Sequence, residues 1–258
     1  MPSRYRAVLF VLAGLLLAAP AHADRRYFVQ SYTPWVQPAG NLELETITIA
    51  RSGQDGATAT GFRNRIELEY GVTDRLTAAA YLNFVQSPEE DAASRFDGPS
   101  LEFLYRLSEP GALAIDPALY FEVRANGSEI EFEPKLLLAR RVYKLVGVFN
   151  AIGEFERITA GDEKGETEKA LGVSAGLSRE LGKSFALGVE SVYTRELLDE
   201  GDDPARWLLG PTLNVQRDKV QLSLGWHVQV AGSPATRDGL NLADFPRSEV
   251  RLLLGVEL

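Results

Sequence analysis

The stretch RNRIELEYGVTDRLTAAAYLNF, from Arg63 to Phe84, shows the pattern that decides the fold. Apolar and charged residues alternate up to Gly71, and a second alternation follows the turn-like sequence Gly71–Asp74. Because side chains of a strand point to opposite faces with a period of two, each half predicts a strand with one oily and one polar face. The two halves therefore form a hairpin. Each strand is about ten residues long, above the five or six typical of soluble strands and close to the roughly 9–11 that cross a bilayer.

The N-terminus has the pattern of a secretory signal peptide over residues 1–23. Arg4 and Arg6 precede an apolar run over residues 7–19, and small residues follow at the cleavage positions. The run is shorter than the roughly 20 residues that a spanning helix needs. Cleavage would leave 258 − 23 = 235 residues, which fits one large β domain. We expect residues 24–40 to be a periplasmic lead-in segment and residues 41–258 to form the barrel.

The charge and cysteine content exclude several classes of function. Without Arg4 and Arg6 the chain has 27 − 2 = 25 basic and 36 acidic residues, a formal charge of −11. A nucleic-acid partner would need a basic surface, so none is expected. Cysteine is absent, which leaves no disulfide framework and no thiol chemistry. No cofactor is expected, and an exported chain without disulfides suits a closed barrel in which every strand has two partners.

Twelve segments with strand-like alternation follow one another from residue 41 to Leu258. Bacterial single-chain barrels have an even number of strands, with short periplasmic turns and longer external loops. The predicted connections alternate in this way, except for the short Asn126–Gly127 hairpin signal. In the first segment the apolar positions shift at Ile47 and Ile49, which predicts a bulge or a weakly alternating stretch there.

The same alternation would also suit a soluble β-sandwich or lipocalin-like barrel, which turns its oily faces inward. Strand length, loop asymmetry and two aromatic belts favour the membrane alternative. The belts comprise Tyr70, Tyr105 and Tyr143 near short turns, and Phe84, Tyr193 and Trp207 near long loops. The sequence therefore predicts an all-β fold, a single antiparallel up-and-down transmembrane barrel of about twelve strands in the bacterial outer membrane. Its partners would be outer-membrane lipid and lipopolysaccharide.

Four stretches carry a family resemblance: Gly40–Glu45, Glu67–Leu76, Phe96–Glu102 and Leu208–Leu213. They resemble a family of predicted bacterial outer-membrane β-barrels of unassigned function, similar in style to candidate outer-membrane transporters found near aromatic-degradation genes. The resemblance implies insertion by the barrel assembly machinery. Such barrels usually end in an aromatic residue, whereas this chain ends in Leu258.

Charged residues on the predicted polar face would point into the lumen. A pore would use them to select solutes, whereas a sealed barrel would pair them off across adjacent strands. A twelve-stranded bore lies between filled eight-stranded barrels and open porins, so size alone decides neither alternative. The candidates are Arg63, Arg65, Glu67, Glu69, Glu102, Arg106, Glu122, Arg124, Glu129, Glu131, Glu133, Lys135, Glu154, Glu190, His227 and Arg251.

A membrane-embedded hydrolase based on His227 is a third hypothesis. Ser223 lies on the same face, but two pleats along a strand span roughly 13 Å, too far for a hydrogen bond. No serine-hydrolase signature is present, so an enzyme is not expected. The acidic loops at Glu89–Asp91, 162–163 and 199–203 lack the spacing of a calcium loop and predict solvated charge.

These patterns favour a narrow channel or transporter for small polar or charged solutes, acting by passive diffusion past Arg and Glu side chains. A closed structural barrel is the alternative. The solute, the oligomeric state and whether residues 27–38 enter the bore are left open by the sequence.

Overall fold

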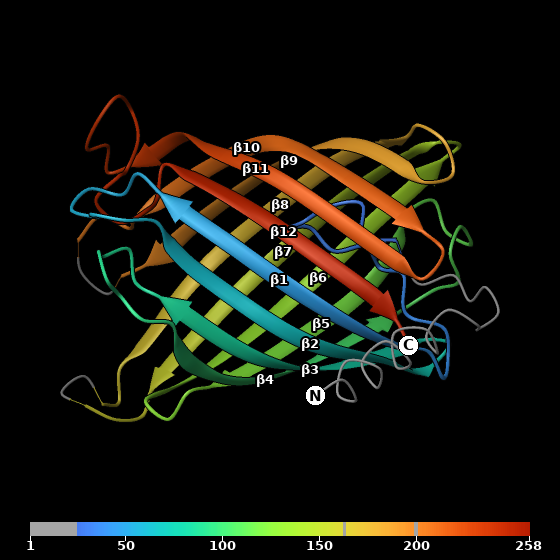
Figure 1. Cartoon of the computed structure of the whole chain (residues 1–258), viewed down its shortest axis with the longest axis horizontal. Helices are drawn as coiled ribbons and strands as arrows, with labels where there is room; N and C mark the ends of the chain where they lie inside the picture. The colour runs from blue at the N-terminus through green and yellow to red at the C-terminus, as the bar shows by residue number, and fades with distance from the viewer. Residues whose placement is uncertain (1–24, 162–163, 199–200) are drawn as a thin grey trace, which may run out of the picture.

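Strands adjacent in the chain pair with one another, and the first pairs with the last. The computed structural model describes residues 25–161, 164–198 and 201–258, which form a closed antiparallel barrel of twelve strands (Figure 1). The predicted signal peptide lies outside the described residues. The strands are β1 (Leu42–Ser52), β2 (Gly61–Thr73), β3 (Leu76–Gln86), β4 (Arg95–Arg106), β5 (Asp116–Ala125), β6 (Glu129–Val142), β7 (Leu145–Ile158), β8 (Thr167–Glu180), β9 (Phe185–Leu197), β10 (Ala205–Arg217), β11 (Val220–Ser233) and β12 (Ser248–Glu257).

The oily face of each strand points outward, as β4 illustrates. Leu101 and Phe103 expose 50% and 43% of their surface, whereas Glu102 between them exposes 1%. A soluble barrel would have the opposite arrangement, because its apolar side chains must leave water. The outward apolar surface identifies a transmembrane barrel of the bacterial outer membrane. The predicted fold class is confirmed. Among the described residues, no helix is long and apolar enough to cross a bilayer.

The two ends of the barrel differ in their connections. At one end of the barrel β1 begins and β12 ends, and the tight turns 74–75, 143–144 and 218–219 lie there. We call it the periplasmic end. The other, outer end carries the longer loops, and the three-residue turn 126–128 is the exception there. The β4–β5 connection at the periplasmic end is longer and runs over residues 107–115. Within it Gly111 N–H donates to Asp116 Oδ1 at the start of β5.

The predicted bulge in the first strand is wrong. β1 pairs without a register shift with both β2 and β12. Ile47 and Ile49 share the inward parity of Glu43 and Glu45, and Ile49 is only 6% exposed. The apolar pair therefore marks an apolar part of the lumen wall rather than a change of phase. Register shifts occur elsewhere, for example in β10 between Trp207 and Leu208.

The segment before β1 does not stay in the periplasm as predicted. Residues 25–40 run inside the barrel, visible as the blue strand-free chain enclosed by the wall in Figure 1. Residues 25–40 contact inward side chains of the wall, which supply polar partners and leave space for the segment. This segment, which we call the plug, organises the site described next.

Candidate functional site

The plug enters at the periplasmic end, turns back near mid-barrel and leaves at the same end. Arg25 contacts the carbonyl oxygen of Lys183, in the β8–β9 turn. The chain then reaches the middle of β9 and β7 at residues 29–32 and returns so that Gly40 N–H donates to Gly71 O at 2.8 Å. The plug therefore forms a hairpin-shaped loop that occupies the periplasmic half of the lumen.

The tip of the plug is held by one carboxylate. Three consecutive backbone N–H groups, of Val29, Gln30 and Ser31, donate to Glu190 at 3.0, 3.1 and 2.7 Å. Glu190 is 1% exposed, and the fully buried ring of His227 lies with Nε2 3.4 Å from its Oε2. Hydrogen bonds from several N–H groups to a charged acceptor are among the stronger ones in proteins. Glu190 is therefore the main anchor of the plug.

Other inward side chains replace the strand pairing that the plug lacks. Asn150 accepts from Tyr32 N–H at 2.7 Å and donates to Tyr32 O at 3.0 Å. On the returning limb, Gln37 N–H donates to Thr77 Oγ1 at 2.9 Å. Arg26 N–H donates to Gln221 Oε1 at 3.0 Å. Buried backbone groups must find partners, and here the wall side chains supply them.

Apolar contacts hold the rest of the plug against β4–β9. Tyr27 and Phe28, each 2% exposed, pack with Trp35 against small and branched residues of β6, β7 and β9. A second cluster places Tyr32 and Val36 on β4, β5 and β6. The wall residues are Leu104, Ala118, Tyr120, Leu137, Ala139, Val146, Val148 and Ala186. On the side formed by β4–β7 and β9, the lumen face in this half is thus largely apolar, which the prediction of a charged interior did not anticipate.

Two glycines of the wall make room for the plug tip. A Cβ atom on Gly176 would lie 2.5 Å from the Phe28 ring, and one on Gly225 would lie 2.3 Å from Val29 Cγ2. Any side chain at either position would require the plug to shift, because real Cβ contacts are never this short. Glycine is needed here for close approach.

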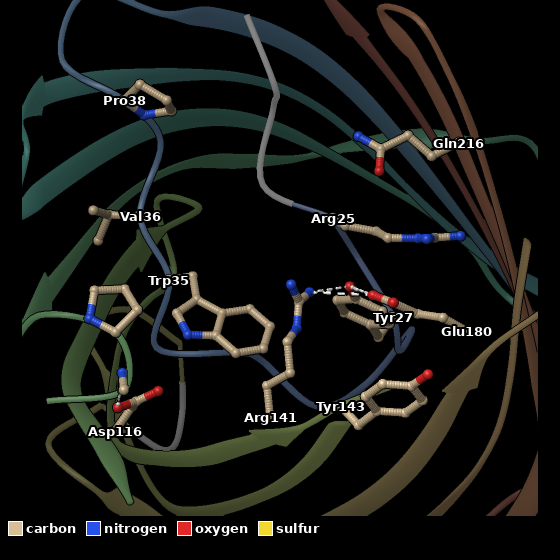
Figure 2. A pocket seen from close by; sticks show the side chains of 12 residues that line it. Arg25, Tyr27, Trp35, Val36, Pro38, Asp116, Arg141, Tyr143, Glu180 and Gln216 are labelled. Atoms are coloured by element: carbon tan, nitrogen blue, oxygen red, sulfur yellow. Dashed lines mark hydrogen bonds and ion pairs between the residues drawn. The ribbon is translucent and has the colours of Figure 1, made fainter. Parts of the chain in front are cut away.

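A cavity of about 710 Å³ opens at the periplasmic mouth beneath the plug. Figure 2 shows Arg141 between Trp35 and Tyr27, pointing to Glu180. Its guanidinium lies 4.9 Å from the Trp35 ring centroid and 3.4 Å from Glu180, while Tyr27 O–H donates to Glu180 at 2.5 Å. Burial, together with this hydrogen bond, raises the pKa of Tyr27 above its usual value. The entrance of the plug is therefore latched by an aromatic–arginine–carboxylate cluster.

The outer half of the lumen is charged. Arg124 Nη atoms lie 3.3, 3.2, 2.6 and 3.6 Å from carboxylates of Asp97, Glu129, Glu131 and Glu156. These residues come from β4, β5, β6 and β7, so one guanidinium links four adjacent strands. Such a network, satisfied by several partners, is rigid.

A second network on the opposite wall is centred on Glu249 of β12. This carboxylate is 0% exposed and lies 3.3, 2.7 and 3.4 Å from nitrogen atoms of Arg51, Arg206 and Arg251. The Arg206 guanidinium also stacks on Phe245, 5.1 Å from its ring centroid. Three guanidinium groups share one carboxylate, so this wall has an excess of positive charge.

A family model described as "Family of unknown function (DUF6662)" matches residues 20–114 and 139–258, most of the chain. The protein belongs to the DUF6662 family. Comparison of the DUF6662 protein with curated protein sequences found no match.

Solved structures similar to this DUF6662 protein include outer-membrane channels and porins. An outer-membrane channel from Pseudomonas putida F1 has a TM-score of 0.67 and 14% identity, over 90% of this chain and 100% of that chain. The KdgM porin has a TM-score of 0.57 and 9% identity, over 84% and 99%. The NanC porin has a TM-score of 0.52 and 12% identity, over 83% and 98%. At these identities the likeness shows a shared fold, which is that of outer-membrane channel barrels.

The sequence-predicted lumen residues of this DUF6662 protein fall into separate groups. Glu67, Glu69 and Glu102 are buried behind the plug, where Glu102 accepts hydrogen bonds from Tyr81 and Tyr120. At mid-barrel, Arg65 lies 3.4 Å from Glu122, and Lys135 lies 2.7 Å from Glu133. Glu190 and His227 hold the plug, whereas Glu129, Glu131, Arg124 and Arg251 belong to the outer networks.

Three further candidates lie outside these groups. Arg63 is an exposed inward residue near the outer end of β2, and Glu154 is a half-buried inward residue of β7. Arg106 does not reach the bore. It lies at the periplasmic rim, where its Nε donates to Asp74 O at 2.5 Å and its Nη2 lies 2.8 Å from Glu109, because β4 ends there. The acidic loop Glu89–Asp91 is exposed as expected, while the 162–163 loop lies outside the described residues.

The functional residues that the sequence reading missed are those of the plug and its apolar wall. A signal for them was present. Near the periplasmic end, the inward positions of β4 and β7 change from charged to apolar at Leu104, Val146 and Val148. Apolar residues on a lumen face need a cover, so this change predicts that something fills that half.

Proposed function

We propose that the protein is an outer-membrane channel for small polar or charged solutes whose periplasmic half is closed by the plug. The observation that carries the proposal is that the lining of the lumen and its seal are formed by different parts of the chain. Charged side chains line the outer half, whereas the seal is made by a separate segment that is not part of the wall. A seal of this kind can move while the wall stays closed.

The contacts of the plug support such a movement. Its polar anchors are mainly hydrogen bonds to individual side chains such as Glu190 and Asn150, and its backbone hydrogen bond to a strand, from Gly40 to Gly71, lies at its end. Breaking them exposes plug and lumen to water, which can take over the hydrogen bonds. Strand pairing in the wall is unaffected, because the plug joins the wall covalently only at β1. Passage would be passive diffusion past the arginine and glutamate side chains of the outer half.

A sealed structural barrel is the second candidate, and one observation favours it. The β11–β12 loop folds inward at the outer end, where Leu240, Leu242 and Phe245 expose at most 8% of their surface. Gln229 holds this loop by donating to Asn241 O at 3.1 Å and accepting from Asn241 N–H at 2.6 Å. Both ends of the lumen are therefore covered, which would suit a barrel that conducts nothing.

The hydrolase hypothesis loses its support in the geometry. His227 is fully buried beside Glu190 and behind the plug, where a solute does not reach it. Ser223 Oγ donates to Arg26 O at 2.7 Å and accepts from Asn214 at 3.0 Å, so it serves the plug as well. Both residues have a positioning role for the plug.

A reversible lock tests the channel proposal, because the chain has no cysteine of its own. Ser31 of the plug and Ser174 of β8 have Oγ atoms 2.9 Å apart, so the double variant S31C/S174C places two thiols within reach of a disulfide. In planar bilayers, the oxidised variant is expected to be silent and the reduced variant to show current steps. The single variants S31C and S174C serve as matched controls and should conduct in both states.

Two outcomes would contradict the proposal. Current that is unchanged by oxidation would mean that solutes pass without movement of the plug. Silence of the reduced variant, of the wild type and of a variant lacking residues 27–37, all with the heat-modifiable migration of folded barrels, would favour the sealed barrel.

A further inference from the structure

We propose that a divalent cation, of the Ca²⁺ type, binds between the plug and strands β1 and β2, in a site formed by Glu43, Glu45 and Glu69 with Glu67 and Gln37 beside them. The cation-binding claim stands on its own geometry. Its consequence, that the cation latches the plug, rests on the proposed channel function.

The register of the wall concentrates negative charge at this place. Glu43 lies directly opposite Glu69, and Glu45 directly opposite Glu67, on two paired strands. All four point inward and are buried, with exposures of 1%, 8%, 0% and 0%. Like charges directly opposite each other destabilise a sheet, and burial strengthens their repulsion. Four carboxylates in a square need a positive partner or protons.

The oxygen atoms are spaced for a single ion. One carboxylate oxygen from each of Glu43, Glu45 and Glu69 lies within 4.8 Å of the others. Ca²⁺ binds oxygen at roughly 2.3–2.6 Å, so an ion between these atoms would contact all three. A cavity of about 10 Å³, lined by Glu45, Glu69 and Gln37, adjoins them. That volume is close to the minimum for one water molecule or one small ion.

A separate observation points to a missing positive partner. Both carboxylate oxygens of Glu67 are buried and have no hydrogen-bond partner, and the side chain faces Glu45, Glu69 and Glu102. Gln37 Oε1, in the plug, is likewise a buried acceptor without a donor. A buried polar group without a partner is costly, so such groups are rare. Here each orphan is an oxygen, the ligand atom that hard cations prefer.

The protein's own cation does not balance the cluster. Arg26 of the plug lies 3.4 Å from Glu45 and stacks 4.5 Å from the centroid of Tyr32. Burial alone would lower the pKa of Arg26, but Glu45 and the neighbouring carboxylates raise it well above its usual value, so Arg26 contributes one fixed positive charge. Gln221 and Gln37 donate neutral hydrogen bonds to Glu43 at 2.6 and 2.5 Å. One guanidinium therefore faces the four paired carboxylates.

The position of the site defines its effect on the plug. Arg26 lies on the entering limb and Gln37 on the returning limb, and both line the cavity. A cation here would neutralise the wall beneath both limbs and give Gln37 Oε1 a partner. Its removal would leave the carboxylates repelling one another under the plug.

Terbium luminescence tests the site, because Trp35 and Tyr32 line the same cavity and can transfer excitation to a bound Tb³⁺ ion. The full mature protein in detergent, freed of metal with EDTA, is titrated with Tb³⁺ under tryptophan and tyrosine excitation. We expect saturation at one ion per chain and displacement by Ca²⁺. The isosteric variant Glu69→Gln should weaken binding by at least about tenfold. Glu154→Gln, an inward carboxylate of β7 outside the site, should bind like the wild type.

Absence of saturable sensitised luminescence in the folded wild type would overturn the proposal, as would equal affinity in the wild type and Glu69→Gln. Heat-modifiable migration shows that each variant is folded. When Ca²⁺ is bound, trypsin should cleave after Arg26 more slowly than it does in EDTA-treated protein. Equal cleavage rates with Ca²⁺ and with EDTA would contradict the proposal that the cation latches the plug. The bilayer result stands apart from these readouts, so a bound cation in a silent barrel would overturn only the channel.

Discussion

The two halves of the lumen are built from the same twelve strands but are closed by different means. In the periplasmic half many inward positions of β4–β9 are small or apolar, as at Ala118 and Val146, and a loop of backbone fills the space. In the outer half they are charged, and guanidinium groups such as that of Arg124 link neighbouring strands. A filler that lies apart from the wall can leave without unfolding it. Ion pairs between side chains of the wall cannot leave the lumen in this way. The periplasmic half is therefore the one that can open.

The energetic difference follows from what replaces each contact when it breaks. Water can satisfy the plug's N–H groups once the tip leaves Glu190, and the loss is mainly the burial of Tyr27 and Phe28, at about 1.5–3 kcal/mol for each fully buried aromatic side chain. In the outer half, removing one partner of a buried ion pair costs about 3–5 kcal/mol, because the other charge is left unpaired.

The largest effect is expected from removing the space that the plug needs. A leucine in Gly225→Leu would occupy the position of Val29, because even its Cβ would lie 2.3 Å from Val29 Cγ2. The plug tip should leave the lumen while the barrel stays folded. Trypsin should then cleave after Arg25 and Arg26, and bilayer currents should rise well above those of the wild type.

Gly147→Ala is the matched control for this variant. Gly147 is also a wall glycine, but a Cβ there would meet nothing within 4 Å. It should resist trypsin like the wild type. If the plug of folded Gly225→Leu still resists trypsin, the proposed difference between the two halves is wrong. The plug would then stay in the lumen although its space at Gly225 is occupied.

The next effect is expected at the anchor of the tip. Glu190→Ala removes the acceptor of three backbone N–H groups and should destabilise the seated plug by about 3–5 kcal/mol, since hydrogen bonds to a charged acceptor are worth about 1.5–3 kcal/mol each and are only partly replaced. Hydrogen exchange followed by mass spectrometry should show faster exchange in peptides covering residues 29–31.

Glu196→Ala provides the control on the same strand, because Glu196 is an inward carboxylate nearer the outer end. Exchange at residues 29–31 should not change in that variant. Equal exchange in both variants would mean that the apolar packing of Phe28, rather than Glu190, sets the stability of the tip.

Much of the fold could be predicted, because alternation along a strand reports directly which face meets lipid. The outward positions of β4 at Leu101 and Phe103 follow that rule without exception. The rule failed where it was used to detect irregularity. Ile47 and Ile49 were interpreted as a bulge, although an unbroken strand can also turn apolar residues inward when the lumen is filled.

The plug could not be predicted from local pattern, because the contacts that hold its tip join residues more than a hundred positions apart, as from Ser31 to Glu190 and from Tyr32 to Asn150. Glu190 was assigned correctly to the inward face, but its partners are backbone N–H groups, which every residue type carries. The role of His227 could not be predicted for the same reason, since its neighbour Glu190 is a carboxylate on another strand. The paired Leu-Glu-Leu-Glu and Ile-Glu-Leu-Glu sequences did hold information. Their four glutamates fall opposite one another once the two strands are in register.

A smaller effect is expected in the outer half. Glu249→Gln keeps one acceptor for the three arginines but removes the charge, so the barrel should lose about 2–3 kcal/mol of stability. The urea midpoint of the heat-modifiable band should fall, while exchange in the plug stays as in the wild type. If plug exchange rose instead, the two halves would be coupled and the contrast between them would not hold.

The smallest effect is expected at the mouth, from Tyr27→Phe. The ring stays buried, but the hydrogen bond to Glu180 and the contact with Arg141 are lost. Arg141 is 47% exposed, so water replaces much of what is lost and the plug should weaken by about 1 kcal/mol or less.

The pH dependence of the same variant gives the sharper comparison. Because the pKa of Tyr27 is raised in the folded state, its contribution is complete below the ordinary tyrosine pKa of about 10 and is lost as the pH rises above that value. Exchange at residues 27 and 28 should therefore increase between pH 10 and 11 in the wild type, beyond the intrinsic rise, and not in Tyr27→Phe. An equal increase in both would place the alkaline sensitivity elsewhere in the plug and leave the mouth cluster without a role in holding it.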